Sequence, residues 1–392
     1  MIGISQRVQG FTESVIREMT RVNNQYNGIN LAQGMPNFPP PRELVEAAHR
    51  ALDGDFHQYA ITWGTARLRQ AIAAKYRRFY GMEVEPDRHV TVCCGSTETM
   101  LATLLAVLNP GDEVIIFEPF YENYGPGCII AGAVPTWVPL EPPDFGFDPD
   151  RLARAVTPRT RAIVFNSPNN PSGKVFSRAD LQAIADLCIK HDLLAITDEI
   201  YEHIIYDGAG HTPIATLPGM ADRTVTISGI SKSYSVTGWR IGYAIANPEL
   251  SVGIRRAHDF ITVGAPHPLQ EAAAVALGLP ESYYTELRQG YQARRDLLFG
   301  EVERAGFVAW KPRGAYYILT DAAHFIKALR LEDDTAFAMW LIKEVGVATV
   351  PGSSFYAHPE LGRTKIRFCF PKTDDVLREA GERLQKLRTI AG

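Results

Sequence analysis

A single lysine, Lys232, stands among small hydroxyl residues in the stretch SGISKSYSVTGWRIGY (228–243), and Arg240 follows it eight positions later. A lysine amine can form a Schiff base with a carbonyl compound, and an arginine fork can bind a phosphate or a carboxylate in two places. The stretch follows the strand-like run TVTIS (224–228), so both side chains should lie beyond the carboxyl end of a strand. Ligands of doubly wound sheets bind at this edge, which predicts that other strand ends carry polar partners.

Polar residues follow the other strand-like runs as well. Ser96 and Thr97 come after HVTVCC (89–94), Tyr121 after EVIIFE (113–118), Asn170 after AIVFNS (162–167), and Asp198 and Tyr201 at and after the end of LLAITD (193–198). Each has an ordinary structural explanation when taken alone: an N-cap, a core aromatic, a turn or a structural salt bridge. Together they offer an anion site, an aromatic ring, an amide, a carboxylate, a phenol and an amine at one edge of the predicted sheet. Pyridoxal phosphate, a flat phosphorylated ring that reacts with an amine, would use all of them.

Helix-like and strand-like segments alternate through most of the chain, which predicts an α/β fold with a mainly parallel sheet covered by helices. The helix-like segments are 66–81, 96–108 and 178–191, and GYAIA (242–246) joins the strand-like runs named above. These strands are apolar on both faces, as buried parallel strands are.

The C-terminal part of the chain has a different pattern. One long helical run extends from about 270 to 300, and after Phe307 come the short strands YYILTD, VATVPG and KIRFCF with two helices. This pattern predicts a smaller α+β domain. The Gly/Pro-rich segment 30–42 should be a loop that crosses the cleft. We therefore expect an N-terminal arm and cleft loop (1–42), a large cofactor-binding domain (43–285) and a small C-terminal domain (286–392).

Composition excludes several classes of protein. With 46% hydrophobic and 21% charged residues, the chain of 392 residues is typical of a globular protein and not of a disordered one. Its net charge of −4 provides no basic surface for nucleic acid. The first residues are interrupted by charges, so we expect neither a signal peptide nor a membrane anchor, and a cytoplasmic location. The five cysteines form no CxxC pair, which indicates reduced thiols and no metal site.

Several motifs resemble those of one enzyme family. NSPNNPSG, TDEIYEHIIY, SKSYSVTGWRIGY and KIRFCF are similar to motifs of the class I (class I/II) aminotransferases, which are pyridoxal-phosphate enzymes of fold type I. NLAQGMPNFPPP resembles the kynurenine, aromatic and methionine aminotransferase branch. The resemblance covers nearly the whole chain and implies the fold-type I architecture, pyridoxal 5'-phosphate as cofactor, and a homodimer with shared active sites.

The resemblance also implies roles for individual residues. Lys232 would form an aldimine with the cofactor and then move the α-proton as a base. Asp198 would pair with the pyridine nitrogen, Asn170 and Tyr201 would hydrogen-bond the phenolic oxygen, and Tyr121 would stack on the ring. The phosphate would be held by Ser96, Thr97, Arg240 and Tyr59 of the partner subunit, and the substrate carboxylate by Gly34, Asn170 and Arg367.

One position departs from the family pattern. Many relatives carry a serine three residues before the lysine, where it donates to the phosphate, whereas this chain has Gly229. We expect either Ser231 or Ser228 to take its place.

Substrate preference follows from what lines the cleft. Enzymes selective for aspartate need a second cation, and no arginine can be assigned there from sequence, since at most one of Arg255 and Arg256 should face inward. Residues at or near cleft positions in relatives are Ile16, Trp63, Tyr121, Phe260 and Phe355. An apolar wall favours aromatic or thioether side chains over an unpaired carboxylate. We therefore expect aromatic amino acids, methionine or glutamine as donors, and a 2-oxo acid such as 2-oxoglutarate as acceptor.

Three alternatives use the same scaffold. An aspartate aminotransferase would need a cation that the sequence does not place. A cysteine-S-conjugate β-lyase would need only a leaving group on the β-carbon. A regulatory sensor normally adds a DNA-binding domain, for which residues 1–30 are too short and not basic enough.

Overall fold

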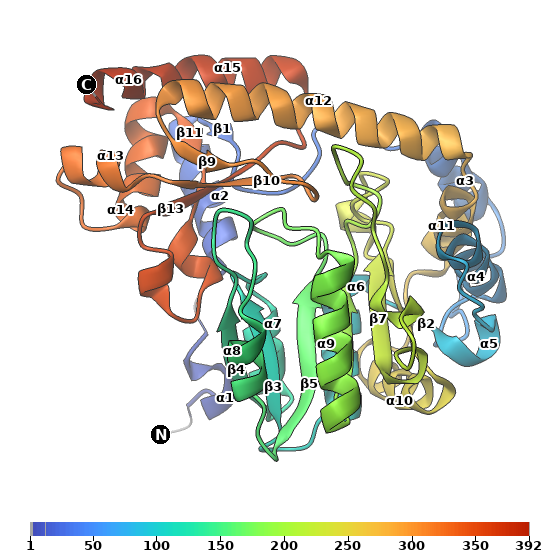
Figure 1. The fold of residues 1–392 in the computed structure, drawn as a ribbon. Coiled ribbons are helices and arrows are strands. Elements are labelled where there is room, and N and C mark those ends of the chain that lie inside the picture. The colour runs from blue at the N-terminus through green and yellow to red at the C-terminus, as the bar shows by residue number, and fades with distance from the viewer. Residues whose placement is uncertain (1–2, 12, 392) are drawn as a thin grey trace.

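The computed structural model describes residues 3–11 and 13–391, and a seven-stranded sheet forms the centre of the fold (Figure 1). Its strand order is β2-β8-β7-β6-β5-β3-β4, with β3 to β7 parallel to one another and β8 antiparallel to both β7 and β2. The strands are β2 (Val90–Cys93), β3 (Glu113–Glu118), β4 (Val134–Pro139), β5 (Thr160–Asn166), β6 (Leu194–Asp198), β7 (Thr224–Gly229) and β8 (Gly242–Ile245). The predicted mainly parallel sheet is confirmed.

The α-helices that surround this sheet and continue into the C-terminal part are distributed along the whole chain. They are α1 (Gln6–Gln9), α2 (Val15–Tyr26), α3 (Arg42–Asp53), α4 (Ala66–Tyr80), α5 (Pro86–His89), α6 (Gly95–Val107), α7 (Tyr124–Ile130), α8 (Pro149–Arg154), α9 (Arg178–His191), α10 (Pro248–Thr262), α11 (His267–Leu277), α12 (Glu281–Ala305), α13 (Ala323–Ala328), α14 (Asp334–Trp340), α15 (Asp374–Leu384) and α16 (Arg388–Ala391).

Helices cover both faces of the large sheet. Ile115, Ile163 and Ala195 share a buried cluster with residues of α9, which Figure 1 shows in front of the sheet. Val164 and Ile196, which point the other way along the same strands, share a different cluster with α6 and α10. Alternate residues of a strand face opposite sides, so a sheet covered on both sides needs apolar residues at every position. This explains why these strands read as continuous apolar runs.

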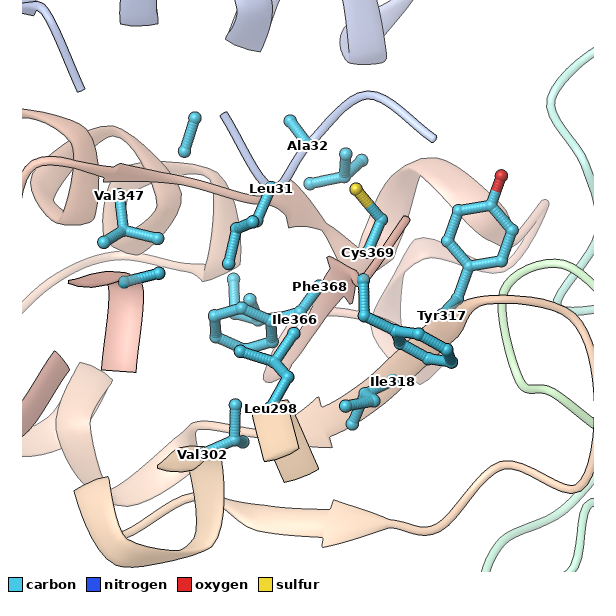
Figure 2. Close-up of a cluster of buried hydrophobic side chains, with 14 of the residues drawn as sticks. Leu31, Ala32, Leu298, Val302, Tyr317, Ile318, Val347, Ile366, Phe368 and Cys369 are labelled. Carbon is cyan, nitrogen blue, oxygen red and sulfur yellow. The ribbon is translucent and has the colours of Figure 1, made fainter. Parts of the chain in front are cut away.

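A second sheet carries the C-terminal part of the chain. Its order is β12-β13-β10-β9, all antiparallel, with β9 (Val308–Trp310), β10 (Tyr317–Asp321), β12 (Val350–Pro351) and β13 (Lys365–Cys369). A short parallel pair, β1 (Ile29–Asn30) with β11 (Val347–Ala348), attaches the N-terminal segment to it. Figure 2 shows Leu31 and Ala32 in the same buried cluster as Phe368 and Cys369 of β13. The N-terminal segment therefore shares its core with the C-terminal sheet.

The long helix α12 takes part in two buried clusters. Tyr284, near its start, packs with residues of α4, β2 and β8. Leu298 and Val302, nearer its end, pack with the C-terminal sheet. The change from one cluster to the other falls within a continuous helix of 25 residues. The division of the chain into three parts stays a prediction.

All the strand-like runs named from the sequence form strands, but the sequence pattern does not predict β1, β4 and β9. The single helical run expected at about 270–300 is wrong, because α11 ends at Leu277 and α12 begins at Glu281. The strand β4 has the sequence VPTWVP, and its two prolines remove donors from the ladder and hide the strand pattern. The strand β9 has only three residues, too few to show an alternation. Among the described residues, no helix is both long enough and apolar enough to span a bilayer.

Candidate active site

A cavity of about 330 Å³ opens at the carboxyl ends of the parallel strands, where the loops after β3, β5, β6 and β7 meet the segment before α3. Ten of the residues predicted for the site line this cavity: Gly34, Ser96, Thr97, Tyr121, Asn170, Asp198, Tyr201, Ser231, Lys232 and Arg240. Arg367 reaches it through Asn170, to whose Oδ1 its Nη1 donates at 2.9 Å. Tyr59 does not line the cavity and is 86% exposed. The structure therefore brings together residues that are up to 333 positions apart in the sequence, from Gly34 to Arg367.

Ser96 and Thr97 lie in the first turn of α6 beside Arg240. The N-cap position belongs to Cys94, so neither hydroxyl acts as the cap, and the N-cap explanation for them is wrong. Strand β8 approaches this turn so closely that a Cβ on Gly242 would lie 2.5 Å from the backbone nitrogen of Ser96. Two hydroxyls, free backbone N–H groups, a helix N-terminus and a guanidinium thus converge on one point. This arrangement suits a dianionic phosphate.

Asp198 ends β6 in a buried position. Its Oδ2 accepts a hydrogen bond from the Tyr124 hydroxyl at 2.8 Å, and its Oδ1 accepts from the Ile200 backbone N–H at 3.2 Å. Burial raises the pKa of Asp198 to about 6, against the lowering effect of these bonds and of Lys232. Within residues 3–11 and 13–391 it has no ion-pair partner within 4.0 Å, so the structural salt bridge considered for it is absent. A buried carboxylate with no countercharge suits a cationic group of a ligand.

Tyr124 and Tyr317 are two site residues that sequence reasoning missed. Both line the cavity, and the Tyr317 hydroxyl lies 2.9 Å from that of Tyr201. Tyr124 begins α7 three positions after Tyr121. This spacing places two residues on one face of a helical turn, so Tyr124 could have been predicted as a second site residue beside Tyr121. Tyr317 gave none, because it belongs to β10 of the other sheet.

Lys232 projects into the cavity with an amine that is easier to deprotonate than usual. Burial, and then the neighbouring Arg240, lower its pKa from 10.5 to about 8, although Asp198 acts in the opposite direction. Its Nζ lies 5.9 Å from the centre of the Tyr201 ring. A larger share of neutral amine near neutral pH makes this lysine a better nucleophile and base.

Arg367 is fully buried between two aromatic rings, with its guanidinium carbon 4.3 Å from the centre of Tyr317 and 4.8 Å from that of Phe355. Its Nη2 donates to the Ala32 carbonyl at 2.5 Å, but its buried Nε has no partner among the described residues. A buried donor without a partner is costly unless a ligand supplies an acceptor. The segment around Gly34 closes over it, and a Cβ on Gly34 would collide with the Tyr317 hydroxyl. These features suit a small carboxylate.

The two serines proposed to replace the missing serine at 229 lie in different surroundings. Ser231 lines the cavity. The Ser228 hydroxyl instead donates to Glu202 Oε1 at 2.7 Å in the interior, so the Ser228 alternative is wrong. At Gly229 a Cβ would lie 2.6 Å from the Ile241 carbonyl oxygen, because β7 and β8 pair closely there. This backbone leaves no room for a serine at 229.

The sequence as a whole matches one family profile. Aminotransferase class I and II matches residues 26–384, which is most of the chain. The chain belongs to this family. It is a pyridoxal-phosphate-dependent aminotransferase of fold type I.

Relatives of this aminotransferase carry different substrate names. Probable N-succinyldiaminopimelate aminotransferase DapC of Mycobacterium tuberculosis is 40% identical, and the alignment covers 97% of this chain and 98% of the relative. Kynurenine--oxoglutarate transaminase 1 of Rattus norvegicus is 34% identical with 98% of each chain covered. A solved Escherichia coli structure with a methionine aminotransferase function superposes with a TM-score of 0.93 at 34% identity, covering 98% of this chain and 100% of that one. The family is thus shown, and the substrate is not fixed by it.

The cavity of the aminotransferase fits its cofactor on three independent points. The first turn of α6 and Arg240 form an anion site, Asp198 is a buried carboxylate that forms no ion pair with any described residue, and the Lys232 amine lies within the same cavity. The Tyr121 side chain lines the cavity as well and supplies an aromatic surface.

The residues expected to select the substrate are only partly in place. Ile16 and Tyr121 line the cavity, and Phe355 lies against Arg367. Trp63 instead faces Arg255, whose guanidinium carbon lies 5.2 Å from its ring centre. Phe260 is 92% exposed and does not line the cavity.

A second arginine, which could not be assigned from the sequence, lines the cavity. Arg17 of α2 lines the cavity, and it forms no ion pair with any residue in the described part of the chain. Neither Arg255 nor Arg256 lines the cavity, and Arg255 instead donates to the carbonyls of Asp87 and Val90. Sequence reasoning overlooked Arg17 because this residue lies 73 positions before Val90, where the first strand of the large sheet begins.

Proposed function

We propose that this aminotransferase moves the α-amino group of an aromatic amino acid, methionine or glutamine to a 2-oxo acid such as 2-oxoglutarate. The observation that carries the proposal is the buried Nε of Arg367, which has no partner among the residues that the structure describes and lies beside a cavity that also holds Lys232. A substrate carboxylate on Arg367 would direct the α-carbon toward the lysine amine. Ile16 and Tyr121 offer apolar contact to the side chain, and relatives named for kynurenine and for methionine support the same class.

In this proposal the protein supplies binding, orientation and a proton carrier. When bound, pyridoxal phosphate supplies the electron sink that makes the α-proton acidic. Lys232 Nζ would take the α-proton and carry it, a role for which the lowered pKa of this amine is suited. Arg367, helped by Asn170 and the backbone of Gly34, fixes the carboxylate so that the Cα–H bond points at the amine.

The remaining residues hold the cofactor. Asp198 would pair with the pyridinium nitrogen, Asn170 and Tyr201 would hydrogen-bond the phenolic oxygen, and Tyr121 would stack on the ring. The phosphate would be held by Ser96, Thr97, Ser231, Arg240 and Tyr59 of the partner subunit. In support, all of these except Tyr59 line one cavity.

The decisive experiment for these roles replaces the lysine. We expect Lys232→Ala to fold and to bind cofactor noncovalently. It should lose turnover by more than the roughly 10²–10⁴-fold typical of one general base, because the exchange of the lysine amine for the substrate amine on the cofactor is lost too. Near-normal turnover of the purified variant would show that another amine is the base.

A second substrate class has its own observation. Arg17 lines the cavity without an ion-pair partner in the described residues, so it would pair with a carboxylate at the far end of a substrate side chain. The relative named N-succinyldiaminopimelate aminotransferase, and the aspartate aminotransferase alternative, both point to substrates of this kind. A cysteine-S-conjugate β-lyase activity has no observation of its own. Release of pyruvate and ammonia without an acceptor would reveal it.

A substrate screen separates these classes. The ratio of kcat/KM for phenylalanine, methionine and glutamine over aspartate is expected to exceed one in the wild type. If dicarboxylic substrates prevail instead, Arg17→Gln should lower their kcat/KM and leave that of methionine unchanged. Arg21→Gln is the matched control, since Arg21 lies one turn further along α2 and pairs with Glu13 at the surface.

We further propose that the enzyme is a cytoplasmic homodimer whose subunits complete each other's sites. Tyr59 and Phe260 support this, since both are large apolar side chains exposed to solvent in the single chain. Their two segments are adjacent, because His258 Nε2 lies 3.0 Å from the Thr62 carbonyl. An exposed apolar surface at this place suits burial by a second copy.

A further inference from the structure

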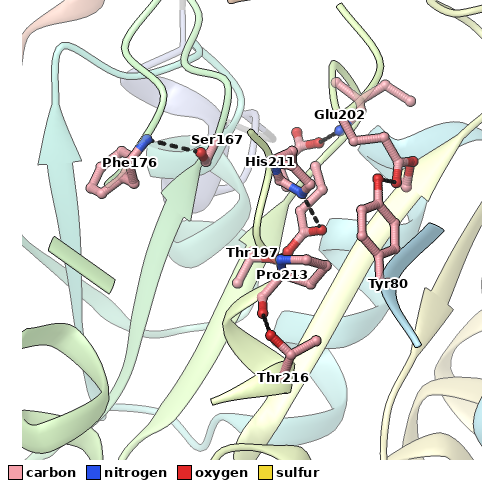
Figure 3. A network of polar contacts seen from close by, with 12 residues as sticks. Tyr80, Ser167, Phe176, Thr197, Glu202, His211, Pro213 and Thr216 are labelled. Carbon is pink, nitrogen blue, oxygen red and sulfur yellow. Dashed lines mark hydrogen bonds and ion pairs between the residues drawn. The ribbon is translucent and has the colours of Figure 1, made fainter. Parts of the chain in front are cut away.

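A buried polar cluster lies behind the active site and does not touch the cavity. Its members, which we call the Lys75 network, are Lys75, Tyr80, Glu202, Ser228 and Tyr243. The Glu202 carboxylate accepts hydrogen bonds from Lys75 Nζ, from the Tyr80 hydroxyl at 2.7 Å and from the Ser228 hydroxyl at 2.7 Å. Lys75 Nζ also lies 2.8 Å from the Tyr243 hydroxyl. Figure 3 shows Glu202 and Tyr80 in contact, with His211 close by.

The two charges of the network are almost fully removed from water. The side chain of Lys75 is 2% exposed and that of Glu202 is 1% exposed. Burial opposes the charge on Glu202, yet Lys75 and nearby imidazoles hold its pKa down at about 2. Next to it, Glu199 accepts from the Thr197 hydroxyl at 2.6 Å and lies 2.7 Å from His211 Nε2. All three hydroxyls of the network and both charges are therefore satisfied within the protein.

The network joins helix α4 to three segments that carry active-site residues. Glu202 directly follows Tyr201 and lies four residues after Asp198. Ser228 of β7 lies four residues before Lys232. Tyr243 of β8 lies three residues after Arg240 and is the register partner of Ser228. Lys75 and Tyr80 come from α4, which supplies no residue to the cavity.

Stability alone does not explain a charge pair in this position. Removing two ions from water is costly, and replacing a buried ion pair with uncharged residues of similar size is often neutral or stabilising. What the pair provides here is a fixed geometry: Glu202 must meet two donors from α4 and one from β7 at once, and an apolar side chain would impose no such arrangement.

We propose that the Lys75 network is a positioning unit that fixes the three strand-end segments carrying Asp198, Lys232 and Arg240 relative to one another. The ring carboxylate, the covalent amine and the phosphate guanidinium then meet one rigid cofactor at the same time. The proposal rests on the proposed roles of these three residues. It predicts that loss of the network loosens cofactor binding and slows turnover without unfolding the protein.

The first test is the double variant Lys75→Met/Glu202→Gln. It removes both charges together, so no lone ion is left buried, and the introduced amide can still accept from Tyr80 or Ser228. We expect a melting temperature close to that of the wild-type apo-protein. We expect the dissociation constant for pyridoxal phosphate, measured by protein fluorescence, to rise and kcat to fall, each by about 10- to 100-fold, as small misplacements of reacting groups do. KM for the amino acid should stay unchanged, because Arg367 lies outside the network.

Two further variants keep the test decisive. Ser228→Ala removes one neutral hydroxyl on the Lys232 side, and it should lower kcat and weaken cofactor binding severalfold even if the double variant fails to fold. Arg69→Met is the control, because Arg69 is a buried cation of the same helix that pairs with Asp87 at 2.5 Å, away from the strand ends. We expect it to leave cofactor affinity unchanged at temperatures where it is folded.

Three results would overturn the proposal: wild-type cofactor affinity and kcat in the folded double variant, wild-type values in Ser228→Ala, or an equal loss of affinity in Arg69→Met. Lys232→Ala distinguishes these failures from failure of the proposed roles. If that variant is inactive while the network variants behave as wild type, only the positioning proposal is wrong.

Discussion

At the scale of single residues, the site depends on one amine held near two arginines. The pKa of Lys232 is lowered to about 8, first by burial and then by Arg240. Only the neutral amine attacks an aldehyde, so capture of pyridoxal by the apo-protein should rise with pH through a midpoint near 8 and not near the ordinary 10.5. Absorbance after mixing with pyridoxal, which lacks the phosphate, measures this rate. Arg240→Gln removes a neighbouring positive charge and should move the midpoint to higher pH; a midpoint near 10 in the wild type would contradict the assignment.

A second prediction at this scale concerns the closest backbone approach in the site. In Gly242→Ala the new methyl group meets Gly95 and the Ser96 nitrogen at 2.5 Å, and backbone atoms cannot move aside as side chains do. We expect a loss of about 1–3 kcal/mol in the free energy of unfolding, as for other overpacked sites, and weaker cofactor binding. Gly238→Ala is the matched control, since nothing lies within 4 Å of a Cβ there. Chemical denaturation and fluorescence titration measure the two effects.

At the scale of elements, the segment between β1 and α3 is fastened to the end of β13. Buried Lys372 donates to the Met35 carbonyl at 2.8 Å, and Thr373 N–H donates to Asn37 Oδ1 at 2.7 Å. Because this segment carries Gly34 at the substrate end of the cavity, Lys372→Met should raise KM for amino acids about tenfold while cofactor affinity stays unchanged. Lys327→Met, at an exposed position of α13, serves as control. Steady-state kinetics that show a change in kcat alone would contradict this role of the segment.

The elements also show how far sequence reasoning reaches. Strands such as EVIIFE are recognisable because both faces are buried, and the residues that follow them could be assigned to one edge. Tyr317 and Arg17 could not be assigned, because each reaches the cavity from another part of the fold. A local sequence pattern does not predict contacts between segments that are distant in the chain. The space around Gly229 and Gly242 is likewise a property of strand pairing and not of either residue alone.

At the scale of the whole molecule, the proposed dimer gives a testable link between assembly and cofactor binding. Phe260→Asp places a charge on the exposed end of α10, next to the segment that contains Tyr59. A charge that must be buried at an interface is costly, so we expect a monomer in sedimentation and a weaker affinity for pyridoxal phosphate. Val308→Asp, exposed on β9 of the other sheet, should change neither. A wild-type monomer with full activity at working concentration would refute the shared site.

The helix α12 packs with one buried cluster near its start and with another near its end, so a bend within it would move one cluster relative to the other. Fifteen residues separate Gly290 from Ala305, a length of about 22 Å, so a bend of about 5° at Gly290 would displace the far end by about 2 Å. The far end packs with the sheet that carries Arg367, whereas the near end packs with the elements that carry the cofactor residues. A displacement of that size exceeds the tolerance of a well-aligned reaction. The bending stiffness of a solvent-facing helix, set by residues that touch neither ligand, thus becomes a determinant of turnover.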